Sequence, residues 1–194
     1  MAKRRTQAER RAETYKQVLD SATRLFGEKG YANTSVDDVA SACGLTTRPI
    51  YHYFGNKKSL FAAVAAAMDE RVVAVMDPGQ GGAAFIESWT GFLNLCEDPA
   101  FRQIALVDSP NILGRDRWAS STTYARARRQ IAAPAADDQS SRYRAELLWR
   151  MTMGALAEAA LMVAEAEDQQ LAREQAEGLV RDIAEALPGS NLLT

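Results

Sequence analysis

The chain has 194 residues, of which 47% are hydrophobic and 25% are charged, a composition that predicts a folded protein with a substantial core. Charged residues interrupt every apolar segment before it reaches the roughly 18 residues of a membrane span, and the basic N-terminus lacks the apolar stretch of a signal peptide. We therefore expect a cytoplasmic protein with no membrane partner.

The charge is unevenly distributed along the chain. The net charge is −2, but residues 1–60 hold 11 Lys and Arg against 6 Asp and Glu. Such asymmetry is typical of a basic module that faces an anion, followed by an acidic body. An uneven solvated surface without function is the alternative.

The first two predicted helices lie in the N-terminal basic region. Apolar residues recur at steps of three and four over 15–26, and Gly30 can supply a left-handed helix end. Ser35 and Asp38 resemble a capping box at the start of a second, short helix. That helix ends at Gly44, which can adopt the positive φ of a tight turn.

A third and a fourth helix follow directly. Thr46 can cap the third helix, which runs through Phe54 before residues 55 and 56 break it. Asn56 is in turn a plausible cap for the fourth helix, which ends at residues 77–79.

The rest of the chain also predicts helices. Residues 85–96 form an amphipathic pattern closed by Asp98 and Pro99, and Pro110, Gly114 and Pro134 punctuate the region beyond. Residues 133–141 have the composition of an exposed loop, and two final helices are expected at about 142–167 and 169–187. No strand pattern is present, so we predict an all-α fold.

The segment 35–54 has the layout of a helix-turn-helix, with two short helices on either side of a glycine turn. A DNA major groove admits one helix, whose N-terminal side chains meet base edges while its opposite face packs on supporting helices. Ile50 and Phe54 recur four apart and are predicted to face inward. Tyr51, His52 and Tyr53 are then left for the groove walls.

The start of the third helix carries the best candidates for reading bases. Arg48 can donate two hydrogen bonds to guanine, and Thr46 and Thr47 can bond phosphates or contact thymine methyls. Pro49 is tolerated because its missing N–H falls in the first turn, where no intrahelical partner exists. Lys57, near the start of the fourth helix, can meet a phosphate or remain a solvated surface lysine.

The runs at 34–40, 44–46 and 50–54, together with Lys57 and Leu60, resemble the signature of the TetR family. The resemblance is close over residues 15–62 and elsewhere concerns only helical layout and length. It implies a homodimer with one helix-turn-helix per subunit, which usually represses transcription until a small molecule binds the larger C-terminal domain.

The resemblance also implies which residues touch DNA, with departures at Arg48, Pro49 and Ser59 that bear on the operator sequence. Combined with the reasoning above, the predicted DNA-binding residues are Thr34, Ser35, Thr46, Thr47, Arg48, Pro49, Tyr51, His52, Tyr53 and Lys57. Residues 3–5 with Arg10 and Arg11 could form an arm that follows phosphates, or a tail that binds nothing.

Apolar stripes on the last two helices predict the dimer interface, in which two helices from each subunit form a four-helix arrangement. The residues assigned to it are Leu147, Met151, Ala155, Ala159, Met162, Leu179, Val180, Ile183 and Leu187. Alternatively, these stripes are consumed inside one subunit.

Aromatic and methionine side chains of the C-terminal part could line a largely apolar effector cavity, although such residues more often belong to the core. The ligand-binding candidates are Trp89, Phe92, Trp118, Tyr124, Trp149 and Met153. We place the DNA-binding domain with its arm at 1–56 and the effector-binding and dimerisation domain at 57–194. The fourth helix is the natural coupling element.

Chemistry other than DNA binding has little support in the sequence. His52 is the only histidine, and Cys43 and Cys96 lack a neighbouring base or a metal-ligand partner. We expect buried reduced thiols, no metal or cofactor, and no catalytic residues. A helical module that binds protein or RNA is the rival interpretation, and an activator or a regulator without ligand also remains open.

Overall fold

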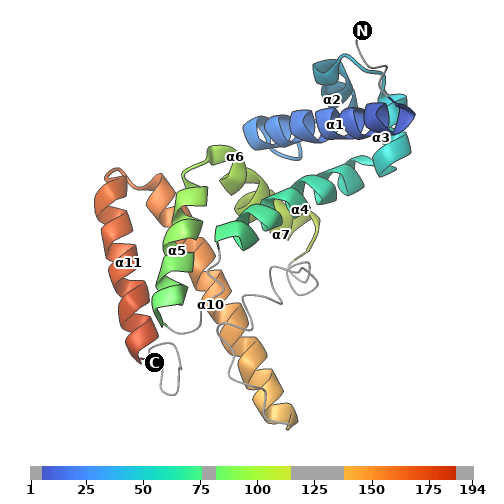
Figure 1. Cartoon of the computed structure of the whole chain (residues 1–194). Coiled ribbons are helices and arrows are strands. Elements are labelled where there is room, and N and C mark those ends of the chain that lie inside the picture. Colours follow the sequence, from blue (N-terminus) through green and yellow to red (C-terminus); the bar gives the residue numbers. More distant parts are fainter. Residues whose placement is uncertain (1–5, 76–81, 115–137, 187–194) are drawn as a thin grey trace. The chain divides into compact units, whose positions relative to one another are not determined.

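The computed structural model describes residues 6–75, 82–114 and 138–186 (Figure 1). Every regular element in these ranges is a helix, which confirms the predicted all-α fold. None of the described helices is both long enough and apolar enough to cross a membrane.

The chain divides into two compact units. The first unit comprises the described residues of Met1–Met68 and Pro99–Arg115, and the second those of Asp69–Asp98 and Asp116–Thr194. Helix α4 (Lys57–Val75) begins in the first unit and ends in the second. Where DNA binding ends and effector binding begins is a functional question, so the boundary at residues 56 and 57 stays a prediction.

Three helices form the N-terminal part of the first unit: α1 (Gln7–Lys29), α2 (Val36–Cys43) and α3 (Thr47–Phe54). Gly30 ends α1 with φ 75° and Gly44 ends α2 with φ 64°, backbone conformations that glycine adopts without steric cost. The predicted helix ends at these two glycines are therefore confirmed, but only Gly44 is left-handed helical, since Gly30 has ψ 167°.

The core of the first unit is built on aromatic and aliphatic side chains. Phe26 of α1 and Phe61 of α4 meet edge to face with ring centroids 5.1 Å apart, and both are at most 1% exposed. Burying a side chain of this size contributes about 1.5–3 kcal/mol. The fully buried large residues of this unit are Val18, Phe26, Thr34, Val39, Ile50, Leu60, Phe61, Val64, Phe101, Ile104 and Ser109.

A distant segment completes the first unit. Residues 99–112 follow one helical path made of α6 (Pro99–Phe101), the π-helix η1 (Arg102–Asp108) and α7 (Ser109–Ile112), and this path packs against α1. A Cβ on Gly27 would lie 2.3 Å from Cβ of Ala100, so only glycine permits this approach. The helical path continues through Pro110, the predicted interruption, and the Ser109 N–H donates to the Ile104 carbonyl in the wider π pattern.

The second unit contains α5 (Gly82–Cys96), α10 (Gln139–Glu165) and α11 (Gln169–Ala186), which pack on one another. Helix α10 begins inside the segment predicted as an exposed loop at 133–141. The reason is an N-cap at Asp138, whose carboxylate accepts from the Ser141 backbone N–H at 2.8 Å. The Ser141 hydroxyl also hydrogen-bonds to this carboxylate. The hydroxyl bond first, and then the backbone bond, lower the pKa of Asp138.

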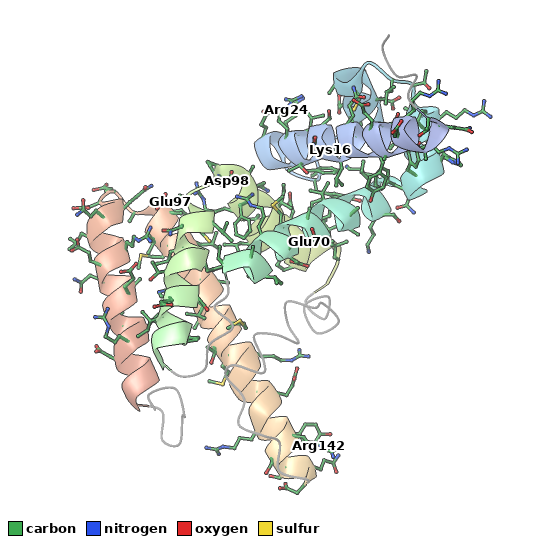
Figure 2. All side chains as sticks on the ribbon, viewed as in Figure 1. Lys16, Arg24, Glu70, Glu97, Asp98 and Arg142 are labelled. Carbon is green, nitrogen blue, oxygen red and sulfur yellow. The ribbon has the colours of Figure 1, made fainter. Side chains whose placement is uncertain are left out.

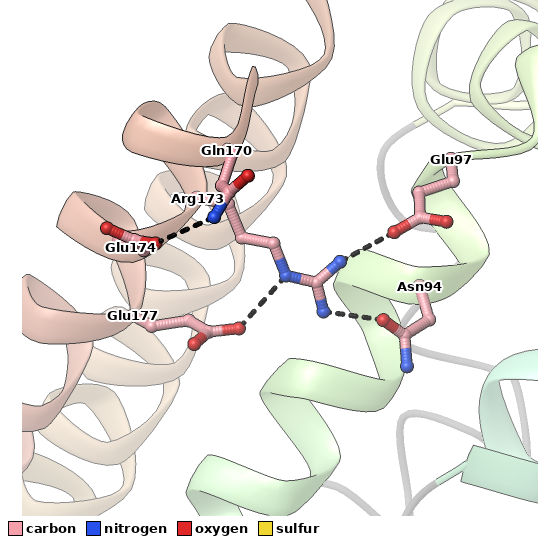
Figure 3. Close-up of polar contacts among 6 residues, drawn as sticks. All are labelled: Asn94, Glu97, Gln170, Arg173, Glu174 and Glu177. Atoms are coloured by element: carbon pink, nitrogen blue, oxygen red, sulfur yellow. Dashed lines mark hydrogen bonds and ion pairs between the residues drawn. The ribbon is translucent and has the colours of Figure 1, made fainter. Parts of the chain in front are cut away.

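Arg173 ties α11 to the C-terminal end of α5 (Figure 3). Its guanidinium lies 2.6 Å from the Glu97 carboxylate, 2.5 Å from the Asn94 amide oxygen and 3.1 Å from Glu177. Figure 2 shows Glu97 beside Asp98, which pairs with Arg71 of α4 at 3.0 Å. Charged side chains thus connect three helices at one end of the second unit.

Replacing Arg173 with Ala is expected to lower the melting temperature by about 2–4 °C, the shift that about 1 kcal/mol produces in a chain of this size. The cost is modest because Glu97 is largely exposed, so solvent screens part of the attraction. The matched control is Gln170→Ala on the same helix, which removes only an exposed contact with Glu174. Thermal unfolding of both variants checks this, and equal shifts would contradict the assigned role of Arg173.

Candidate nucleic-acid interface

Helix α3 has a buried inner face and an exposed outer face. Ile50 is 1% and Phe54 9% exposed, whereas Tyr51 is 51% exposed. The ring of Tyr15 from α1 stacks on Phe54 with centroids 4.9 Å apart. This confirms the prediction that Ile50 and Phe54 face inward, and it leaves Tyr51 and His52 exposed on the other side.

The turn between α2 and α3 is fixed to α1. The backbone N–H of Leu45 donates to the Ala40 carbonyl at 2.9 Å, and the side chain of Gln17 donates to the Cys43 carbonyl at 2.9 Å. These bonds satisfy carbonyls that the end of α2 would otherwise leave unpaired. They also hold the start of α3 at a defined distance from the supporting helix.

The predicted capping box at the start of α2 is confirmed. The Asp38 backbone N–H donates to the Ser35 hydroxyl at 3.0 Å, and the Ser35 N–H donates to the Asp38 carboxylate at 2.7 Å. The Ser35 hydroxyl donates to the same carboxylate at 2.6 Å. These bonds, that of the hydroxyl first, lower the pKa of Asp38. The Ser35 side chain is exposed, but its hydroxyl is already engaged.

The start of α3 differs from its prediction. Thr46 occupies the N-cap position, but its side chain makes no capping hydrogen bond. The residue three positions along is Pro49, which has no N–H to donate. Thr46 and Arg48 are exposed, and Thr47 and Pro49 are half-buried.

Thr34 is a core residue, which corrects its prediction as a DNA contact. Its side chain is 1% exposed, and its hydroxyl bonds to the carbonyls of Gly30 at 2.9 Å and Leu25 at 3.2 Å. Thr34 therefore closes the C-terminal end of α1 and has no free donor to offer DNA.

Lys57 and Tyr53 lie at the edge of the outer face. The Lys57 ammonium is 4.2 Å from the centroid of the Tyr31 ring, a cation–π contact that holds a flexible side chain in place. Tyr53 is half-buried and meets Tyr15 edge to face at 5.9 Å. Arg10 and Arg11 are exposed on α1 and not on an arm, while residues 3–5 lie outside the described residues.

The effector candidates are described only in part. Trp89 is 2% exposed and lies 5.9 Å from the half-buried Phe92 ring on the same helix. The buried Trp89 indole N–H has no hydrogen-bond partner among the residues that the structure describes. Met153 is half-buried on α10. Trp118, Tyr124 and the side chain of Trp149 lie outside the described residues.

The dimerisation candidates separate into exposed and buried residues. Leu147, Met151, Met162 and Leu179 are 54–71% exposed; Ala155 is exposed and Ala159 is half-buried. Val180 is 7% exposed, so it packs inside the second unit and its assignment to the interface was wrong. The Ile183 side chain and Leu187 lie outside the described residues.

Tyr143 is an exposed residue that the sequence prediction missed. It is 63% exposed on α10, and its position four residues before Leu147 extends the same stripe. We call the exposed side chains of Tyr143, Leu147, Met151 and Met162 on α10, with Leu171 and Leu179 on α11, the apolar stripe. Tyr143 lies inside the helix predicted at about 142–167, but the stripe assigned from the sequence began at Leu147.

The remaining residues with reactive side chains are dispersed. Cys43 and Cys96 are both buried, as predicted, and no disulfide forms among the described residues. Among the described residues, no three His, Cys, Asp or Glu side chains gather as a possible metal site.

Two family models match the chain. Residues 18–64 match bacterial regulatory proteins of the tetR family, and residues 83–187 match the tetracyclin repressor-like C-terminal domain. The first match contains α2, α3 and the turn between them. The second alone covers more than half of the chain.

Solved structures share the fold over most of the chain. A TetR-family transcriptional regulator from Pectobacterium atrosepticum is 32% identical, with a TM-score of 0.62 over 92% of this chain and 95% of that one. The fatty acid degradation regulator FadR from Bacillus halodurans has a TM-score of 0.61 over 92% of this chain and 96% of that one. Its identity is 15%, so that likeness concerns the fold alone.

Curated relatives match over shorter stretches of the chain. An HTH-type transcriptional repressor of Mycobacterium tuberculosis is 40% identical over 60 residues, 31% of this chain and 32% of the relative. The HTH-type transcriptional regulator AcrR of Shigella flexneri is 40% identical over 52 residues, 27% of this chain and 24% of the relative. The chain therefore spans less than half the length of these relatives.

The correction at Thr34 predicts how Thr34→Val behaves. Removing a buried hydroxyl that serves two carbonyls is expected to destabilise the protein by about 1–3 kcal/mol. Affinity for DNA, measured at a temperature where the variant is folded, is expected to stay within about twofold of the unaltered protein. The control is Thr14→Val, whose hydroxyl bonds an exposed carbonyl on α1. Loss of DNA binding without loss of stability would restore Thr34 as a DNA contact.

Proposed function

Because the chain belongs to the TetR family of bacterial regulatory proteins, we propose that it is a dimeric cytoplasmic repressor, without catalytic activity, that binds a palindromic operator. Helix α3 reads the major groove, and a small-molecule effector releases the DNA. The observation that carries this proposal is the geometry of α3, which is anchored by Ile50 and Phe54 and has its polar start exposed.

In this proposal the residues of α3 have different tasks. Arg48 is exposed at the start of the helix and reads a guanine, because its guanidinium can donate two parallel hydrogen bonds. Thr47, Tyr51 and His52 contact the groove walls. Lys57 contacts a phosphate with its ammonium held over the Tyr31 ring.

The apolar stripe is the proposed dimer interface. Large side chains that are more than half exposed lie on both α10 and α11, and exposed apolar surface of this kind marks interaction sites. Pairing with a second copy would bury it. A homodimer carries two α3 helices, and on a palindromic operator these would enter successive major grooves, whose centres lie about 34–36 Å apart.

The effector in this proposal contacts Trp89. A buried indole N–H without an acceptor is costly, and a ligand with a hydrogen-bond acceptor would remove that cost. The Asp108 carboxylate of η1 accepts from the Tyr31 backbone N–H at 2.7 Å, so a shift of η1 would reach the residue on which Lys57 rests. Helix α4 continues from Lys57 out of the first unit and into the second.

Selection from random duplexes by the purified protein tests the proposed function. We expect an inverted repeat. With that duplex, Arg48→Ala should relax preference at one base pair per half-site, a loss of about 1–3 kcal/mol of discrimination. Lys57→Ala should weaken binding to all sequences and reduce the dependence on salt. Anisotropy titrations at several salt concentrations measure both.

Lys16→Ala is the control for the loss of one positive charge, because Lys16 is exposed on α1 and paired with Asp20. It should change neither sequence preference nor affinity by more than about twofold. If Arg48→Ala behaves like Lys57→Ala, the assignment of base reading to Arg48 is wrong. If no sequence is enriched by a folded dimer, an interaction module replaces the repressor.

If the apolar stripe is the dimer interface, introducing a single charge there should produce monomers. Met151→Glu and Leu179→Glu each place a carboxylate where apolar side chains would meet, and burying it unpaired is expensive. We expect sedimentation velocity to show a folded monomer with weakened operator binding. Gln170→Glu adds the same charge on α11 outside the apolar stripe and should remain dimeric. Dimers in all three variants would place the interface elsewhere.

A further inference from the structure

The starts of α1, α2, α4, α10 and α11 share one capping geometry. In each case the N-cap side chain accepts a hydrogen bond from the backbone N–H of the residue three positions later. The pairs are Thr6 with Glu9, Ser35 with Asp38, Asn56 with Ser59, Asp138 with Ser141, and Asp168 with Leu171, at 2.8–3.2 Å. An N-cap oxygen in such a pair is engaged within the protein.

Helix α3 departs from this geometry. Its N-cap Thr46 has φ −83° and ψ 167°, the same extended conformation as Ser35 with φ −99° and ψ 165°. The backbone at Thr46 is therefore ready for capping, yet no capping bond forms. The donor that the other five N-caps use is missing here, since the residue three positions later is Pro49 and proline has no N–H.

The consequence is a free hydroxyl at the tip of the proposed reading helix. Thr46 is exposed, and its side chain forms no hydrogen bond among the described residues. The contrast with Ser35 is direct, because the Ser35 hydroxyl both accepts from and donates to Asp38. Of the two N-cap hydroxyls in the helix-turn-helix, only that of Thr46 is available to another molecule.

We propose that Pro49 is a positioning residue that keeps the Thr46 hydroxyl free to donate a hydrogen bond to an operator phosphate. The inference rests on the proposed function. It gives Pro49 a role through Thr46, without contact between the proline ring and DNA. A phosphate is the expected acceptor because hydroxyls and helix starts commonly bind the DNA backbone, which fixes the register of the helix.

The test is a cycle of four proteins: the unaltered chain, Thr46→Val, Pro49→Ala and the double variant. Each is measured for affinity to the selected operator and for melting temperature. Thr46→Val should weaken operator binding about tenfold, and by the same factor for other sequences. It should leave the melting temperature within about 1 °C, because no capping bond is lost.

Pro49→Ala supplies the missing N–H and should draw the Thr46 hydroxyl into a cap, which weakens operator binding by a similar factor. In this background Thr46→Val should change affinity by less than about twofold, but should lower the melting temperature by about 2–4 °C. If Pro49 had a merely structural role, Thr46→Val would have the same effects with Pro49 or Ala at position 49. It would not lower affinity in the first case and the melting temperature in the second.

Several outcomes would overturn the proposal. It fails if Thr46→Val binds the operator like the unaltered chain, or if the effects of the two substitutions on affinity are additive. A change in base preference on Thr46→Val would mean that the Thr46 hydroxyl bonds to a base and not to a phosphate. If the unaltered chain selects no operator, the proposed function fails instead; the melting temperatures still decide whether Pro49 prevents the cap.

Discussion

The burial of Ile50 and Phe54 is the constraint on which the reading helix depends. Helix α3 has eight residues, and an isolated helix of that length is not stable in water. It exists because these side chains pack into the core of the first unit, where Tyr15 stacks on Phe54. The outer face is thereby freed from any role in folding. Arg48 and Tyr51 are exposed and take no part in the packing that keeps the helix in place.

Much of the first unit could be predicted because its signals are local. Gly30 and Gly44 end helices through their own backbone freedom, and the Ser35 cap is complete within four residues. The inward face of α3 follows from a spacing of four. Helix α1 also carries a local start signal, a capping box between Thr6 and Glu9. A search for apolar periodicity passes over it, because the first turns of α1 are polar and exposed.

The features that could not be predicted depend on distant contacts or on one missing atom. Thr34 looks like a polar residue before a helix, and only the fold of α1 brings the carbonyl of Leu25 to its hydroxyl. Arg173 meets Glu97 across 76 positions of sequence. Proline is tolerated in the first turn of a helix, so the sequence alone gives no sign that the Thr46 cap is missing. The loss is found only from the hydrogen bonds of the folded chain. In each case the sequence does not tell which hydrogen-bond donor pairs with which acceptor.

In the proposed complex, two copies of α3 enter successive major grooves of one duplex. Hydroxyl-radical footprinting of the protein on its selected operator tests this most directly. We expect protected patches on one face of the duplex, related by two-fold symmetry and centred about 10–10.5 base pairs apart, or a multiple of that turn. A single protected patch, or protection on opposite faces of the duplex, would contradict it.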